Sequence, residues 1–506
     1  MLTILQEMFT VNNILMMFIG VGAGIIIGVL PGLGTNFAIT VLLTMTFGMD
    51  KYSGIYLLLG AYCGAMYGGS ITAILINTPG TTGAVPTTFD GYPLAQQGRA
   101  GDALNTALYS SVFGGLVSAI ALMFFAPQLA KVVLLVASPE YFCLCIFGLC
   151  AAISIAGDNK LKGVISAMLG LMVSAVGMDP HFGTARFTFG NYKLSSGFKA
   201  ATCMLGAYAL STILIKCREV YLKGGEQASG AIEFQKSKMK FIDVIKYWRT
   251  LIRSSLLGVL IGAIPGTGGA ISAMLSYNEA RRASKHPELF GKGAPDGIAA
   301  AESANNGCSG GAMIPMLSLG VPGDSNTAVL MGAFIMHGFQ PGPMMYVEHL
   351  DIVYAVFGAL LAANLAFLVV GMLGVNLFSK VISVERYFLI PCILVLSLVG
   401  AYAINQSMFD VFFAIVMGVV GYLLQKYGFP LSPILLALIL GPMSESNIRR
   451  YMQIVDGHFE RIFTRPICIV FFALALLSLV TALLNQRKIA RREAEAEARA
   501  AAETQA

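Results

Sequence analysis

Charged side chains are scarce in this sequence. Only 12% of its 506 residues are charged, 56% are hydrophobic, and the mean hydropathy is +0.73. An average soluble domain is about one quarter charged, so this composition excludes an ordinary soluble protein and indicates one embedded in lipid. Apolar runs agree, because Phe357–Leu377, Tyr387–Ile404 and Ile467–Leu484 each approach the length of about 20 residues that crosses a bilayer.

The sequence also lacks the short motifs of several functional classes. It has no GxxxxGK[ST] phosphate loop, its nine cysteines include no CxxC pair, and its five histidines are dispersed without metal-ligand spacing. We therefore expect no metal site and no cofactor. The net charge of +6 does not indicate nucleic acid, because it lies mostly in the loop from Lys216 to Arg253 and in the tail after Gln486. Basic loops beside membrane spans usually mark the cytoplasmic face.

Two stretches of the chain share an ordered series of motifs. Gly28–Gly34 and Gly262–Gly268 both read GxxPGxG. The series continues in the same order through three more pairs: Tyr67-Gly-Gly-Ser70 with Ser309-Gly-Gly311, Asn77-Thr-Pro-Gly80 with Gly320-Val-Pro-Gly323, and Asp90-Gly-Tyr-Pro93 with His337-Gly-Phe-Gln-Pro341. This order predicts an internal duplication. The predicted parts are a first transmembrane repeat (residues 1–215), a basic cytoplasmic linker (216–253), a second transmembrane repeat (254–485) and a charged cytoplasmic tail (486–506).

Pro-Gly pairs interrupt apolar segments at four matched places in the two halves. Proline and glycine break the helical hydrogen-bond ladder, and at membrane depth the freed backbone groups must face protein or a water-filled cavity. Corresponding breaks in two halves indicate the binding site of a transporter. The alternative is that Gly and Pro are simply common in membrane helices.

The charges around Ser254–Ser276 are basic at both ends, which places both ends in the cytoplasm. Two half-helices of about eleven residues, rising about 1.5 Å per residue, would reach mid-membrane and return through a turn at Pro265–Gly269 as a re-entrant hairpin. The counterpart, Ile14–Phe47, has no basic cluster and is expected to enter from the outside. The predicted fold is an all-α polytopic membrane protein of about twelve membrane segments. Its two inverted repeats would provide alternating access, with an elevator-type motion as the preferred form.

Small polar side chains flank all four breaks. The start of each following half-helix offers unpaired N–H groups and a positive dipole end that favour an anion, while hydroxyl and amide groups can bind a carboxylate or a cation. The predicted substrate-binding residues are Gly32, Gly34, Thr35, Asn36, Asn77, Thr78, Gly80, Thr81, Gly266, Thr267, Gly268, Gly323, Ser325, Asn326 and Thr327. For each Ser, Thr and Asn the alternative is an ordinary helix cap.

Two acidic residues lie in apolar stretches, where burying a carboxylate is costly. Asp324, together with Asn326 and Thr327, is the candidate site for a coupling cation, either Na⁺ or H⁺. The competing role of Asp324 is that of an N-terminal helix cap. Glu302 has a weaker case, because its place near Asp296 suggests a cytoplasmic helix start.

An enzymatic alternative rests on the string Gly307-Cys308-Ser309-Gly310. It resembles the serine motif of rhomboid intramembrane proteases, with His337 as a possible base. The match is only four residues long in a chain rich in Gly and Ser, and the duplicated half offers no histidine partner. We therefore expect no catalytic residues.

The motifs also resemble a known family. Gly28–Asn36, Tyr67–Thr72, Asn77–Gly80, Asp90–Pro93 and Gly320–Asp324 closely resemble the large membrane subunit, TctA, of tripartite tricarboxylate transporters, over about residues 14–460. The resemblance implies a multi-pass permease of the bacterial inner membrane that takes up citrate-like di- or tricarboxylates with an ion gradient. It also implies two partners, a small membrane subunit and a periplasmic solute-binding protein. The alternative within the same class is a stand-alone cation-coupled carboxylate symporter.

Overall fold

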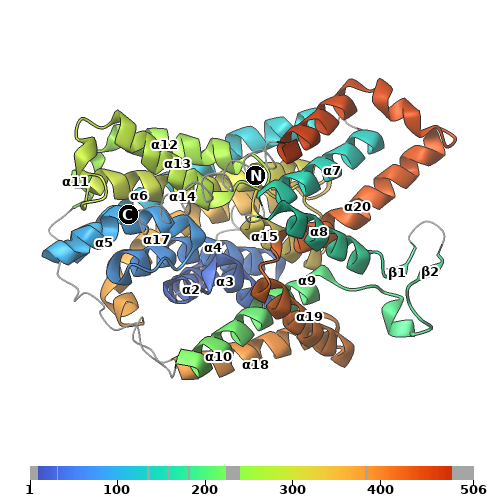
Figure 1. Ribbon diagram of the computed structural model, residues 1–506, viewed down its shortest axis with the longest axis horizontal. Coiled ribbons are helices and arrows are strands. Elements are labelled where there is room, and N and C mark those ends of the chain that lie inside the picture. The colour runs from blue at the N-terminus through green and yellow to red at the C-terminus, as the bar shows by residue number, and fades with distance from the viewer. Residues whose placement is uncertain are drawn as a thin grey trace, which may run out of the picture. The chain divides into compact units, whose positions relative to one another are not determined.

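The computed structural model describes residues 10–30, 32–133, 137–155, 159–179, 183–223, 240–381 and 386–480. Within these residues the chain is mostly helical, as predicted, with one short pair of strands (Figure 1). The predicted tail and residues 224–239 of the predicted linker lie outside the described residues.

Six helical stretches among the described residues are long and apolar enough to cross a membrane. They are Val11–Val29, Lys51–Ile76, Thr82–Lys131, Ala200–Arg218, Leu350–Gly374 and Met408–Lys426. The structure thus agrees with a helical membrane protein, because each stretch approaches or exceeds about 20 residues. The number of crossings, about twelve, stays a prediction.

The chain forms two compact units, and neither unit is one of the predicted halves. The first unit comprises Met1–Leu135 and Ala201–Tyr422, and the second comprises Val136–Ala200 and Leu423–Ala506. Each half of the chain therefore contributes a long stretch to the first unit and a shorter stretch to the second.

The helices of the first unit come from both halves of the chain. Their bounds are α2 Val11–Val29, α3 Gly34–Leu43, η1 Thr44–Thr46, α4 Lys51–Ile76, η2 Thr82–Ala84, α5 Val85–Leu94, η3 Ala95–Arg99, α6 Ala100–Val133, α9 Ala200–Met204, η5 Leu205–Leu210, α10 Ser211–Lys223, α11 Phe241–Ile245, α12 Trp248–Gly262, α13 Gly268–Ala283, η6 Pro287–Leu289, α14 Pro295–Leu319, α15 Ser325–Met336, α16 Met345–Glu348, α17 Leu350–Val381, α18 Arg386–Asn405 and α19 Met408–Lys426.

The second unit is smaller and packs α20 against α7 and α8 (Figure 1). Its elements are α7 Ser138–Ile155, α8 Lys160–Ser174, β1 Gly177–Met178, β2 Ala185–Arg186, η4 Tyr192–Leu194, α20 Ser432–Ile454 and η7 Phe459–Thr464. The two strands are antiparallel, and Gly177 pairs with Arg186. Arg186 then binds Glu445 of α20 at 2.5 Å, which ties the hairpin to the helix.

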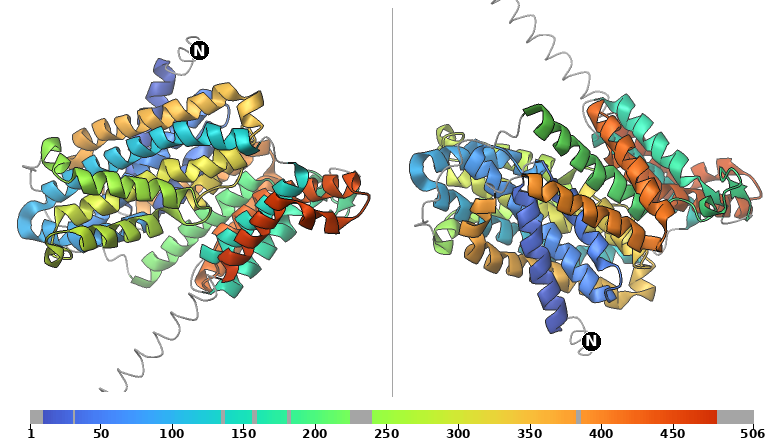
Figure 2. Two further views of the ribbon diagram at one scale, coloured as in Figure 1. Left: turned by 90° about the horizontal axis from the view of Figure 1, so that it is seen from above. Right: turned by 90° about the horizontal axis from the view of Figure 1, so that it is seen from below.

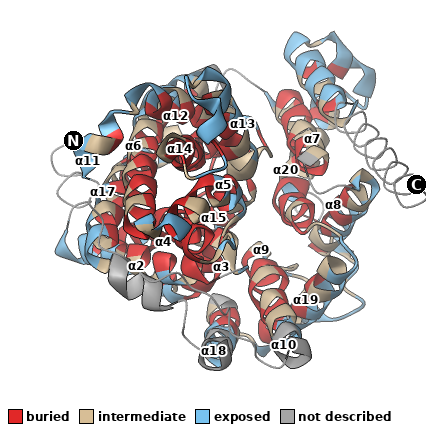
Figure 3. Cartoon of the chain, turned by 60° about the vertical axis from the view of Figure 1, so that its left-hand side comes forward, coloured by how far each residue is buried: buried red, intermediate tan, exposed pale blue. Residues whose placement is uncertain are grey.

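Helices α4 and α14 are the buried centre of the first unit (Figure 3), and nearly all their residues are buried. Helix α2 packs against α4, while α6, α12 and α13 run alongside α14 (Figure 2). Glycine allows these close approaches, because a Cβ at Gly24 would lie 2.5 Å from the Ala61 carbonyl oxygen. A side chain there would push the two helices apart.

The contacts between α12 and α14 match those between α2 and α4. A Cβ at Gly258 would lie 2.5 Å from the Ala304 carbonyl oxygen, as a Cβ at Gly24 would from that of Ala61. Three more contacts between a glycine and the facing backbone have a counterpart in the other helix pair, always at the same spacing along the chain. The contact of Gly28 with Ala65 matches that of Gly262 with Cys308, the contact of Gly64 with Val21 matches that of Gly307 with Ser255, and the contact of Gly68 with Ile25 matches that of Gly311 with Val259. The two helix pairs therefore pack in the same register.

The predicted hairpin around Pro265 is present as a pair of helices. Helix α12 ends at Gly262, α13 begins at Gly268, and the two helices pack against each other. They have 15 and 16 residues, so they are longer than the predicted eleven or so. The extra residues lie at the ends away from the turn, where Arg249 and Arg282 are found.

Candidate functional site

Both GxxPGxG motifs join two helices through a turn that requires glycine. In each turn, both glycines of the PGxG sequence have positive φ, in the region that side chains with a Cβ rarely adopt. The angles are 78° at Gly32, 74° at Gly34, 86° at Gly266 and 70° at Gly268. The two turns therefore have equivalent backbone conformations, and α3 and α13 begin directly at their second glycines.

The second break of each half also follows a common pattern. Helices α4 and α14 end in left-handed caps, at Asn77 with φ 53° and at Gly320 with φ 71°. Three residues later, the N–H of Gly80 donates to the Gly69 carbonyl at 3.0 Å, and the N–H of Gly323 donates to the Ala312 carbonyl at 3.2 Å.

Each second break lies directly against the first break of its own half. A Cβ on Gly80 would collide with the Gly28 carbonyl oxygen, and a Cβ on Gly323 would lie 2.5 Å from that of Gly262. In the second half the Gly266 N–H also donates to the Gly323 carbonyl at 2.6 Å. The breaks are thus packed in pairs within each half.

Contacts across the halves bring all four breaks together. Asn36 Nδ2, in the first turn of α3, donates to Ser325 Oγ at the start of α15 at 3.1 Å. Helix α13 packs against η2, which follows the break at Asn77. The amide of Asn305 on α14 lies between these segments, because its Oδ1 atom occupies the space that a Cβ on Gly83 or Gly269 would need.

Four buried polar atoms on these elements have no hydrogen-bond partner among the described residues. They are Asn36 Oδ1, Tyr62 Oη, Thr81 Oγ1 and Asn305 Nδ2. Buried polar atoms are nearly always paired in folded proteins, so unpaired ones call for an explanation. Their place beside the helix breaks, which also expose backbone donors, suits a polar ligand.

The alternative that the polar residues beside the breaks are ordinary helix caps holds at the start of α15 but not at the starts of α3 and α13. Asp324 is the N-cap of α15: its Oδ1 accepts from the Thr327 N–H at 2.7 Å, and Thr327 Oγ1 accepts from the Asp324 N–H at 2.9 Å. By contrast, α3 and α13 have no side-chain cap among the described residues, and Thr267 donates to the Ile264 carbonyl at 3.0 Å. Thr35 and Asn36 lie inside the first turn of α3.

The candidate cation residues form one connected group. Asp324 is 5% exposed. Its Oδ2 atom accepts from Asn326 Nδ2 at 3.1 Å, and its Oδ1 atom accepts from Thr327 Oγ1 at 2.7 Å. These bonds explain why the three residues occur together as a helix cap, and a cation role for them stays a prediction.

Two predicted residues of the second break are exposed, unlike the buried polar atoms described above. Asn77 and Thr78 are exposed at the end of α4. Thr78 Oγ1 donates to the Ile76 carbonyl at 3.2 Å. The left-handed cap explains the amide side chain of Asn77, because asparagine tolerates that conformation better than most residues.

The motifs that begin with Asp90 and His337 make equivalent contacts across the halves. Asp90 Oδ1 accepts the N–H groups of Gly291, Gly293 and Ala294 at 2.8–2.9 Å, in the loop before α14. His337 Nε2 lies 2.9 Å from Thr46 Oγ1, just before the loop that leads into α4. Each motif thus anchors the long central helix of the other half.

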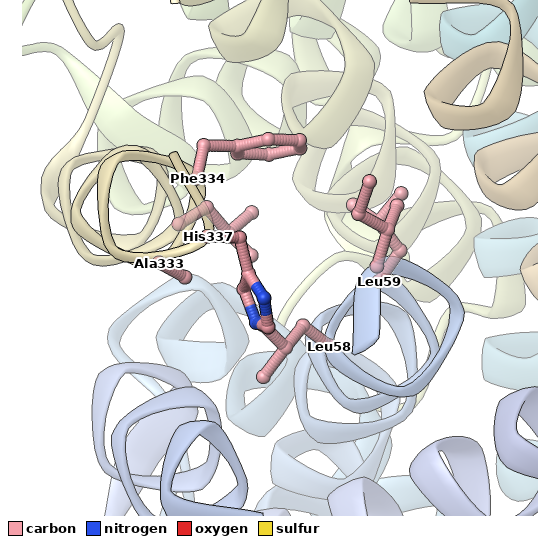
Figure 4. Close-up of a pocket in the computed structure, with 7 residues that line it drawn as sticks. Leu58, Leu59, Ala333, Phe334 and His337 are labelled. Carbon is pink, nitrogen blue, oxygen red and sulfur yellow. The ribbon is translucent and has the colours of Figure 1, made fainter. Parts of the chain in front are cut away.

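The protease alternative finds no support in these contacts. Ser309 Oγ donates to the Asn306 carbonyl at 2.6 Å, whereas the hydrogen bond of His337 goes to Thr46. His337 instead borders a small cavity of about 10 Å³ between α4 and α15 (Figure 4). The cavity is otherwise apolar, with Leu58, Leu59 and Phe334 among its walls. The proposed serine and histidine therefore do not form a hydrogen-bonded pair.

Three residues near the breaks were not predicted from the sequence. Asn305 and Tyr62 lie in the middle of long helices, and the register match places them at equivalent positions. Lys216 was assigned to the linker, yet a Cβ at Gly32 would lie 2.8 Å from its Nζ atom. A cation beside the first break suits an anionic ligand. In the sequence, the signal that could have pointed to Asn305 and Tyr62 was that each is a polar residue in a helix made mostly of apolar or small residues.

The interpretation of Glu302 as part of a helix start is wrong. Helix α14 begins at Pro295, so Asp296 lies in its first turn, whereas Glu302 is two turns further on and 0% exposed.

The paired broken helices define a multi-pass helical membrane protein of the transporter class. The chain matches the description "Tripartite tricarboxylate transporter TctA family" over residues 14–436, and it belongs to this family. It is also 36% identical over 479 residues to an uncharacterized 52.8 kDa protein in the TAR-I ttuC' 3' region of Agrobacterium vitis, covering 95% of each chain. A second protein, from the TAR-II ttuC' 3' region of the same organism, is 34% identical over 227 residues, which is 45% of this chain and 94% of the relative. No solved structure matches.

Proposed function

We propose that this chain is the membrane permease subunit of a binding-protein-dependent secondary transporter for di- or tricarboxylates. In this proposal it lies in the bacterial inner membrane and works with a small membrane subunit and a periplasmic solute-binding protein. The family to which the chain belongs supports these partners. A cation gradient drives uptake, with Asp324, Asn326 and Thr327 as candidate ligands.

The observation that carries this proposal is the meeting of four helix breaks around unpaired polar atoms. Asn36 joins the first and fourth breaks, and Asn305 lies between the second and third. Helix starts without side-chain caps provide N–H donors and positive dipole ends. Together with the nearby Lys216 ammonium, this arrangement favours an anion with several oxygen atoms, such as a carboxylate.

The matched packing of the two halves supports alternating access. Helix pairs α2–α4 and α12–α14 share one register, and each half contributes to both compact units. We propose that the halves are inverted repeats and that the hairpins α2–α3 and α12–α13 are re-entrant. Two such halves can exchange conformations around one central site. An elevator-type motion is the form of alternating access that we propose.

The test is transport of radiolabelled citrate, tartrate and succinate by proteoliposomes that contain the chain and its small membrane subunit. A solute-binding protein that recognises these carboxylates is added on the side from which uptake is measured, and a parallel sample omits it. We expect uptake only with the binding protein present, and a loss of about tenfold in Asn305→Leu. That loss corresponds to one missing hydrogen bond to a charged ligand.

Ser166→Ala is the matched control, because Ser166 Oγ on α8 is also buried and has no hydrogen-bond partner in the part of the chain that the structure describes, but it lies in the second unit. It should retain uptake within about twofold. Uptake that needs no binding protein would identify a stand-alone symporter. If none of the three carboxylates is transported, or if Asn305→Leu transports normally, the proposed site is wrong.

A further inference from the structure

Glu302 on α14 is a buried carboxylate surrounded by hydroxyl groups. Its Oε1 atom accepts from Ser70 of α4 at 2.6 Å and from Thr87 of α5, and its Oε2 atom accepts from Ser111 of α6 at 2.8 Å. All four side chains are 0% exposed. Within the described part of the chain, no lysine, arginine or histidine forms an ion pair with Glu302.

A carboxylate in this position favours a neutral form. Burying an ionised carboxylate without a positive partner is expensive, and neutralisation is the usual outcome. The three hydroxyls suit both states, because a hydroxyl can donate to the ionised carboxylate or accept from the protonated acid. All oxygens thus keep partners when a proton is gained or lost.

The duplicated half shows that the fold does not require this polar cluster. By the register of α4 and α14, Glu302 corresponds to Leu59 and Ser70 to Met313. Leu59 borders the apolar cavity beside His337 (Figure 4). Equivalent positions in the same packing therefore accept apolar side chains. A polar cluster that packing does not need indicates a function.

The cluster is directly connected to the helix breaks. Glu302 is one helical turn before Asn305, and its carbonyl accepts from Asn306 Nδ2 at 3.2 Å. Ser70 follows Gly69, whose carbonyl binds the Gly80 N–H at the second break. A change in the hydrogen bonds around Glu302 can therefore reach the proposed substrate site within one turn of each helix.

We propose that Glu302 is a proton-binding site whose protonation is coupled to carboxylate transport. The Glu302 carboxylate takes a proton from a hydronium ion on one side of the membrane, so that an O–H bond of hydronium breaks and leaves water while the O–H bond of the carboxylic acid forms. On the other side that O–H bond breaks, and the proton passes to water as hydronium. The phenol of Tyr67 on α4 is a titratable group close enough to Glu302 for the charge of Glu302 to act on it. Ser70, Thr87 and Ser111 provide the remaining polar contacts. This inference rests on the proposed transport function.

The test compares two modes of transport in proteoliposomes. Exchange of internal for external citrate at equal pH needs no net proton movement, whereas net uptake driven by a pH gradient does. Glu302→Gln, which keeps the shape but cannot release a proton, should retain exchange within about twofold. It should lose gradient-driven uptake, and the matching signal of a trapped pH dye, by at least about tenfold. Glu348→Gln, at an exposed position, is the matched control and should retain both activities.

Three results overturn the proposal: gradient-driven uptake that persists in Glu302→Gln, loss of exchange together with uptake in the folded variant, or wild-type uptake that follows a Na⁺ gradient without proton movement. If wild-type vesicles exchange no carboxylate, the transport function itself fails. Should Glu302→Gln not fold, Ser111→Ala provides the second measurement. Removing one hydrogen bond from the carboxylate should shift the pH dependence of uptake by about one unit, and an unchanged profile would contradict the role.

Discussion

Asn36 Nδ2 donates to Ser325 Oγ at 3.1 Å, although 289 residues separate them in the chain. This bond joins the helix that follows the first break to the helix that follows the fourth. The oxygen of the Asn36 amide, Oδ1, is buried without a partner among the described residues. The same side chain thus connects the two halves and keeps one acceptor for a ligand or for water.

Asn36→Ala should raise the half-saturating concentration of carboxylate about tenfold, because it removes both the bridge and an acceptor that can bind the coupling cation or a water molecule beside the substrate. Ser325→Ala should have a smaller effect, since Asn36 remains. Titration of initial uptake rates measures both. Equal effects of the two variants would show that only the bridge matters, and no effect of Asn36→Ala would remove this residue from the site.

Gly80→Ala and Gly323→Ala should each destabilise the fold by about 1–3 kcal/mol. A methyl group at either position would meet the backbone carbonyl of the preceding break, at Gly28 or Gly262. Gly22→Ala is the control, because a Cβ there meets nothing within 4 Å. Thermal unfolding in detergent measures the difference. If all three variants melt alike, the close packing of the breaks is wrong.

Asp90→Ala should destabilise the protein by about 2 kcal/mol, because Asp90 accepts three backbone N–H groups and the Tyr277 hydroxyl. Tyr277→Phe removes only one of these bonds, at 2.9 Å, and should cost about 1 kcal/mol. Melting temperatures of the two variants and the double variant provide a thermodynamic cycle. A larger effect of Tyr277→Phe than of Asp90→Ala would contradict the anchoring role of the carboxylate.

Asn77→Gly should leave both stability and uptake unchanged, whereas Asn77→Ala should lose about 1 kcal/mol of stability. The reason is the left-handed conformation of this cap, which glycine adopts freely and which Gly320 adopts at the equivalent position. Paired melting and uptake measurements test this. A strong loss of uptake in Asn77→Gly would show that the amide contacts substrate, as the sequence prediction proposed.

The helix breaks could be predicted because their cause is local. Proline lacks an N–H group, and glycine adopts positive φ freely, so the two PGxG motifs mark their own turns wherever they lie. The contacts between the breaks could not be predicted. Asn305 occurs in a run of small residues and gives no sign that its amide fills the space beside Gly83 and Gly269.

The role of each polar residue also depended on its tertiary partners. Asp324 and Glu302 look alike as acids in apolar sequence, yet Asp324 caps a helix and Glu302 is held by hydroxyls from three other helices. Lys216 was assigned to the linker because it begins a basic segment. Its charge alone could not show that its ammonium lies beside Gly32.

The sequence by itself determined the membrane class, the four helix breaks and the family, because hydropathy, backbone conformation and motif order are properties of the chain alone. Tertiary structure alone decided that the four breaks meet, that Asn77 is exposed, and that Glu302 is enclosed by Ser70, Thr87 and Ser111. Those outcomes depend on which helix faces pack together, and in this chain that is set by glycine contacts between helices far apart in sequence.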